Sequence, residues 1–174
     1  MAALASGDDR ALIPEGLTGT GLSIGVVRAR WNTDVVQRLA DGAARSLDEL
    51  KVRKTVEVSV PGCFEIPLAA KYLAESGEVD AIVCIGAVIR GETTHYELVA
   101  GECGRGVQDV QIQTNVPVAF GVLTVENLDQ ALARSEGPGG HNVGEEAAAG
   151  AVEMARLAQK WLPLRKAQPK EGNR

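Results

Sequence analysis

The chain has 174 residues, of which 45% are hydrophobic, so it is expected to form one domain with a proper core. Its net charge of −5 comes without a long basic face, which argues against nucleic-acid binding. Three cysteines without a paired C-x-x-C spacing and two lone histidines give neither a zinc pattern nor a disulfide framework, so we expect no metal and a reducing, cytoplasmic setting.

The two ends of the chain differ in composition from its body. Residues 1–19 mix Ala, Ser, Gly, Asp and Pro and are predicted to form a flexible arm, without the long apolar run of a signal peptide. Residues 20–162 are expected to form the single domain, and residues 163–174 a polar C-terminal tail. The longest apolar run, residues 81–89, is too short to span a bilayer, so no membrane partner is expected.

Predicted strands and helices alternate along the body of the chain. Short apolar or β-branched runs predict strands at residues 22–27, 55–60, 80–86 and 116–123. Apolar residues at helical spacing predict helices at residues 33–50, 68–77, 94–114, 125–132 and 145–161. Asn32 or Thr33 is expected to cap the first helix, and Thr124 the short fourth one. Short strands that are apolar on both faces predict the α/β class: a three-layer αβα sandwich around a four-stranded parallel sheet.

Ligands of such a sheet bind beyond the carboxyl ends of its strands. A helix N-terminus that follows a buried strand and a polar turn, as at residues 80–99, is also a common place for an anion. Four of the six aromatic residues are expected at these ends, which suggests a pocket for a flat ring. The residues expected there are Trp31, Asn32, Cys63, Phe64, Glu65, residues 87–95, Tyr96, Phe120 (near the end of the fourth strand), Arg134 and His141.

Each of these residues also has a purely structural interpretation. Trp31 could plug the sheet edge, and Phe120 could belong to the core. Glu65 could be a helix N-terminal charge that the dipole favours, while Arg134 and His95 could be solvated surface residues. The remaining candidates could be buried hydrophobes or loop residues: Cys63, Cys84 and His141. The joint placement at one end of one sheet is what favours a site.

Four segments, in order, carry a specific resemblance: PGCFEIPLAAK (61–71), AVIRGETTHYELV (87–99), VPVAFGVLT (116–124) and QALARS (130–135). Together they closely resemble the 6,7-dimethyl-8-ribityllumazine synthase family, in one register from about residue 22 to residue 160. The resemblance implies a flavodoxin-like fold, with an extra N-terminal strand that pairs with a neighbouring subunit. It also implies a transferase of riboflavin biosynthesis. That enzyme condenses 5-amino-6-(D-ribitylamino)uracil with 3,4-dihydroxy-2-butanone 4-phosphate, without a metal or organic cofactor.

The resemblance also assigns roles to particular residues. His95 matches the catalytic histidine, and an imidazole can accept and return protons near neutral pH. Trp31 stands where the family usually has a Phe that stacks on the pyrimidine ring. Residues matched to binding of the ribitylaminouracil are Trp31, Asn32, Cys63, Phe64, Glu65, Ala87, Val88, Ile89 and Phe120. Residues matched to the butanone phosphate are Glu92, Thr93, Thr94 and Arg134.

Members of this family place their active sites between adjacent subunits of a pentamer, so the resemblance implies a homopentamer. Trp31, residues 63–65 and residues 87–95 would come from one subunit. The neighbour would contribute Phe120, Arg134 and the 139–144 loop. Val143 is a departure, because the family often has a basic residue at this position. The GGHN sequence of the loop is similar to that of members that stop at pentamers.

Two competing functions stay open on the sequence. The first is an archaeal-type riboflavin synthase of similar size and fold, although the GETTH and PGCFEIP segments fit lumazine synthase better. The second is a non-catalytic scaffold that binds flavin or forms a shell, to which only Val143 points.

Overall fold

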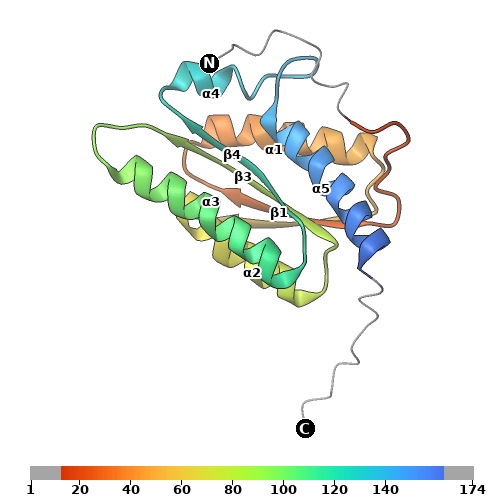
Figure 1. The fold of residues 1–174 in the computed structure, drawn as a ribbon. Helices are drawn as coiled ribbons and strands as arrows, with labels where there is room; N and C mark the ends of the chain where they lie inside the picture. The colour runs from red at the N-terminus through yellow and green to blue at the C-terminus, as the bar shows by residue number, and fades with distance from the viewer. Residues whose placement is uncertain (1–12, 163–174) are drawn as a thin grey trace.

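The computed structural model describes residues 13–162 as a parallel β-sheet covered by helices on both faces (Figure 1). The predicted arm and tail fall largely on residues 1–12 and 163–174, which lie outside the described residues. The elements in chain order are β1 (Ser23–Ala29), α1 (Thr33–Glu49), β2 (Lys54–Val60), the 3₁₀ turn η2 (Cys63–Glu65), α2 (Ile66–Ser76), β3 (Ala81–Ile89), α3 (His95–Thr114), β4 (Val118–Val125), α4 (Leu128–Leu132) and α5 (Val143–Trp161).

The four strands are parallel and pair in the order β2-β1-β3-β4. Helices α1 and α5 pack together on one face of the sheet, and α2 and α3 on the other (Figure 1). Successive residues of β3 are buried against opposite faces, with Val83 in the core under α1 and α5 and Cys84 in the core under α2 and α3. The predicted three-layer αβα sandwich is therefore confirmed.

Two strand boundaries differ from the predicted ones, and both differences affect the site. β3 continues to Ile89, because its last three residues pair with residues 123–125 of β4. β4 begins at Val118, after Pro117, which has no N–H to donate to a ladder. Phe120 is therefore the third residue of β4, opposite Cys84, and its predicted place near the carboxyl end of that strand is wrong.

The predicted helix caps were also partly wrong, because strand pairing and tertiary contacts take up the residues concerned. Thr124 lies within β4, and the cap of α4 is Asn127, whose Oδ1 accepts from the Gln130 N–H at 2.9 Å. Asn32 occupies the N-cap position of α1 but makes no capping bond there. Within residues 13–162, no helix is both long and apolar enough to cross a bilayer.

Candidate active site

The loop after β1 is tied to the end of β3 by Asn32. Its backbone is left-handed, with φ of 58°, a conformation that Asn tolerates better than most residues. Its Nδ2 donates to the Ala87 carbonyl oxygen at 2.9 Å, across the sheet. This turn leaves Trp31 at the surface, with 68% of the residue exposed. An exposed indole at the carboxyl edge of the sheet can offer its face to a planar ring.

The end of β3 extends beyond the residues that pair with the neighbouring strand β1. Pairing between the two strands ends with Arg28 opposite Ile85, whereas pairing between β3 and β4 continues to Ile89. The edge of residues 87–89 that faces β1 therefore extends past the last paired residue of that strand. Backbone donors and acceptors along such an edge can hydrogen-bond the rim of a heterocycle, and Asn32 uses only the Ala87 carbonyl.

The η2 turn after β2 presents one buried and two exposed predicted residues. The Cys63 thiol packs so closely on β3 that a Cβ at Gly86 would lie 2.6 Å from its sulfur. Burial raises the pKa of Cys63 to about 11, so this thiol acts as a packing group and not as a nucleophile. Phe64 is exposed, and Glu65 Oε2 accepts from the Gly62 N–H at 2.9 Å. That bond orients the Glu65 carboxylate at the surface of the turn.

The loop from β3 to α3 carries the predicted phosphate and proton-transfer residues. Glu92, Thr93 and Thr94 are exposed, and His95 is the first residue of the 20-residue helix α3. The His95 N–H points at the Thr93 Oγ1 at 3.4 Å. An exposed imidazole at a helix start, next to two hydroxyls and the positive end of the helix dipole, suits an anionic substrate that must exchange protons.

Arg90 lies in the predicted 87–95 segment, but it was not assigned a role of its own. Its guanidinium forms ion pairs with Glu97 in α3 and with Glu126 after β4, and it stacks on the Tyr96 ring. The Arg90 side chain holds the pKa of Glu97 below its usual range. In the sequence, this arrangement is indicated only by Glu97, seven positions after Arg90, and that spacing predicts no contact when Arg90 lies in a loop.

Two predicted site residues, Phe120 and Arg134, lie away from the residues at the carboxyl ends of β1, β2 and β3. Phe120 is 40% exposed on the edge strand β4, and its ring ends beside Gly104 of α3. Arg134 follows α4, beyond the end of the helix, and its Nη1 donates to the Gln130 carbonyl oxygen at 3.1 Å. Among residues 13–162, no hydrogen bond or ion pair joins the Arg134 side chain to His95.

The loop after Arg134 is held mainly by Asn142, the N-cap of α5. His141 pairs with Glu146 at 3.0 Å in the first turn of that helix. The Val143 N–H donates to the Arg134 carbonyl oxygen at 3.0 Å, so Val143 fixes the backbone beside Arg134 and brings no charge. No group of three His, Cys, Asp or Glu side chains within residues 13–162 is arranged to hold a metal ion.

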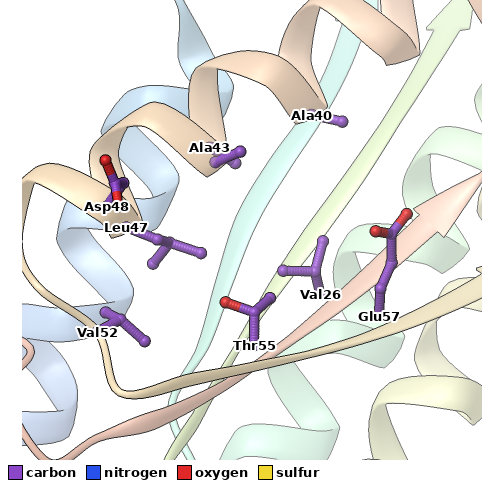
Figure 2. Close-up of a pocket in the computed structure, with 9 residues that line it drawn as sticks. Val26, Ala40, Ala43, Leu47, Asp48, Val52, Thr55 and Glu57 are labelled. Atoms are coloured by element: carbon purple, nitrogen blue, oxygen red, sulfur yellow. The ribbon is translucent and has the colours of Figure 1, made fainter.

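A groove of about 310 Å³ lies elsewhere, between α1 and β2. Figure 2 shows Val26, Leu47 and Val52 lining it, with Thr55 and Glu57 from the edge strand. It contains none of the predicted site residues. The chemistry-bearing residues lie instead on the open surface at the carboxyl ends of β1, β2 and β3.

The fold and this surface define an α/β sandwich whose candidate site lies at the carboxyl edge of a parallel sheet. The family model described as 6,7-dimethyl-8-ribityllumazine synthase matches residues 21–159. The chain therefore belongs to the 6,7-dimethyl-8-ribityllumazine synthase family, a transferase family of riboflavin biosynthesis.

A solved structure, the GDP-L-fucose synthetase from Naegleria fowleri, matches at 12% identity with a TM-score of 0.36. The match covers 93% of this chain and 49% of that one, so the chain spans about half the length of that protein. A likeness at this level carries no argument about fold or function.

Proposed function

We propose that this chain condenses 5-amino-6-(D-ribitylamino)uracil with 3,4-dihydroxy-2-butanone 4-phosphate to give 6,7-dimethyl-8-ribityllumazine, phosphate and water. The observation that carries the proposal is the placement of His95. It is exposed at the start of α3, directly after Thr93 and Thr94, in a chain of this family. The reaction has an anionic substrate and several proton transfers, and this junction offers groups suited to both.

The pyrimidine substrate is proposed to bind between Trp31 and the end of β3. The exposed indole provides a stacking face, and the free edge of Val88 and Ile89 provides hydrogen-bonding groups for the uracil rim. Phe64 adds a second exposed ring, and Glu65 has a surface carboxylate that can accept the ribityl hydroxyls. In this arrangement Asn32 positions the Trp31 loop through its bond to Ala87.

The phosphate substrate is proposed to lie at the loop between β3 and α3. The N-terminal N–H groups of α3 and the helix dipole favour a dianion, and the two threonine hydroxyls can donate to it. Glu92 opposes an anion by charge, so its proposed contact is with a hydroxyl of the substrate. Arg134 supplies a planar fork of donors, which suits a phosphate.

His95 is proposed to move the protons. The amine of the pyrimidine adds to the ketone to form a carbinolamine, which loses water. Phosphate is then eliminated, and ring closure releases the second water. Each step needs a proton taken from one atom and returned to another, and a positioned imidazole contributes about 10²–10⁴-fold to such steps. The rest of the acceleration comes from holding two reactants together.

A homopentamer with sites between adjacent subunits is part of the proposal. Its support within one chain is that Phe120 lies on the free edge of the sheet, three residues before the level of Ala87. Within the described part of the chain, the one side-chain hydrogen bond of Arg134 is likewise with its own helix. Both residues are available to complete a neighbouring copy's site.

The test is an assay of lumazine formation from both substrates, with phosphate measured in parallel. The proposal predicts one phosphate per lumazine and no product without either substrate. Riboflavin formed from lumazine alone would favour the competing riboflavin synthase. Flavin binding without turnover would favour the scaffold. His95→Ala is expected to leave slow, measurable turnover, lower by about 10²-fold or more. Full turnover of that variant would exclude the role of His95.

A further inference from the structure

Arg90 marks the point at which β3 ends and the loop to α3 begins. Its backbone N–H donates to the Val125 carbonyl oxygen at 2.9 Å, which extends the contact between β3 and β4 by one residue. Its guanidinium carbon lies 4.2 Å from the centre of the Tyr96 ring, in the first turn of α3. The side chain therefore turns back across the loop toward the helix.

The guanidinium joins the end of β3, which carries Arg90, to two other segments. It pairs through Nη1 with Glu97 of α3, and through Nε with Glu126 Oε2 at 2.7 Å, in the segment after β4. A planar fork of five donors can serve two carboxylates while its face rests on a ring, whereas an ammonium group cannot. The two carboxylates around Arg90 carry more negative charge than its guanidinium carries positive charge, which argues against a role as a phosphate ligand.

The loop that Arg90 spans has little else to hold it. A Cβ at Gly91 would meet nothing within 4 Å, so the backbone is not packed there. The two hydrogen bonds between the loop and the start of α3 are long, at 3.4 Å for His95 N–H to Thr93 Oγ1 and 3.5 Å for Leu98 N–H to the Thr94 carbonyl oxygen. The Arg90 contacts reach over the whole loop, to Glu97 in α3 and, at 2.7 Å, to Glu126 after β4.

We propose that Arg90 is a positioning residue for the reaction, because it closes the loop of residues 91–94 at its base and so fixes the position of His95. This inference rests on the proposed function for its catalytic consequence, but not for the contact itself. Arg90 acts through His95 and touches no reacting atom. A small displacement of a proton-transfer group is costly, so loosening the loop lowers kcat more than it weakens substrate binding.

The kinetic test compares Arg90→Gln with Arg105→Gln. Arg105 is a matched control, because it also pairs with two carboxylates, Glu102 and Asp109, but only within α3. Arg90→Gln is expected to lower kcat about tenfold and to raise the KM for the butanone phosphate by a smaller factor, because Thr93 and Thr94 lie in the same loop. Arg105→Gln leaves both unchanged. Arg90→Lys keeps the charge but loses the fork, so it stays close to Arg90→Gln.

Two further readouts separate positioning from other roles. In a His95→Ala background, Arg90→Gln is expected to cost nothing more, because the two residues act as one unit. Hydrogen exchange of the amides of residues 91–95, measured without substrate, is expected to be about tenfold faster in Arg90→Gln and unchanged in Arg105→Gln.

The outcomes distinguish this inference from the proposed function. Unchanged exchange in Arg90→Gln overturns the inference whether or not the protein makes lumazine. An equal loss of kcat in both backgrounds, or a loss confined to the KM of the phosphate substrate, also overturns it. Wild-type protein without lumazine synthesis refutes the proposed function, and the exchange experiment then still decides whether Arg90 holds the loop.

Discussion

Asn142 is expected to be the residue whose loss most damages the loop that follows Arg134. It is 2% exposed, and its Nδ2 donates to the Glu136 carbonyl oxygen at 2.8 Å and to the Arg38 carbonyl oxygen of α1 at 3.1 Å. Its Oδ1 accepts from the N–H groups of Gly144 and Glu145 at 3.0 and 3.2 Å, which caps α5. One amide thus fixes the loop to two helices.

The magnitude for Asn142→Ala follows from these bonds. Loss of a helix cap costs about 1 kcal/mol. The Glu136 carbonyl also loses this buried partner, which costs about 1–3 kcal/mol. The Arg38 carbonyl keeps its bond within α1, so its loss of Asn142 adds little to the cost of the substitution. We therefore expect the free energy of unfolding to fall by about 3 kcal/mol.

The assay is urea unfolding at fixed protein concentration, because the proposed assembly would make stability depend on concentration. The matched control is Asn127→Ala, which removes an exposed cap with a single bond from Gln130, and it should cost no more than about 1 kcal/mol. Equal losses in the two variants would refute the reasoning, because the additional bonds of Asn142 would then contribute nothing.

Three further predictions concern the core, the packing of α5 and the substrate face. Burial raises the pKa of Cys63 from 9.0 to about 11, so the unfolded chain loses this proton at a lower pH than the folded chain. The contribution of this thiol to the free energy of unfolding should be full below about pH 9 and should fall as the pH rises toward 11. A free energy of unfolding that stays constant over this range in urea unfolding would contradict the prediction. Gly144→Ala would place a Cβ 2.0 Å from an α1 carbonyl oxygen and should cost about 3 kcal/mol or more, whereas Gly150→Ala on the same helix meets nothing within 4 Å and should be neutral or slightly stabilising in thermal unfolding. With Trp161→Phe, Trp31 is the single tryptophan, and the ribitylaminouracil should quench its fluorescence; an unchanged signal at saturating substrate would exclude stacking on this ring.

The sequence predicted the layers well because the apolar periodicities of strands and helices are local. All four strands and the main helices were found, and the parallel arrangement followed from their alternation. The ends of β3 and β4 were wrong because pairing between strands sets them, and a single strand does not reveal its partner's length. For this reason Phe120, which was predicted near the carboxyl end of β4, is the third residue of that strand.

The parts of the site that depend on long-range contacts could not be predicted. Asn32 is a good helix cap by type, but a carbonyl 55 residues away takes its amide. Arg90 gains its partners only when the segment after β4 comes beside the loop after β3. Cys63 has the structural role that its residue type allowed, a buried thiol packed against Gly86 of β3.

Mixed assembly tests most directly the claim that two copies complete a site for lumazine synthesis. His95→Ala and Arg134→Ala subunits are co-expressed in equal amounts, and lumazine formation is compared with that of each variant alone. In a ring whose sites take His95 from one copy and Arg134 from the next, about a quarter of the sites are intact, so activity should rise to about a quarter of wild type. Activity no higher than the average of the two variants would contradict the claim, because a site within one chain gains nothing from mixing.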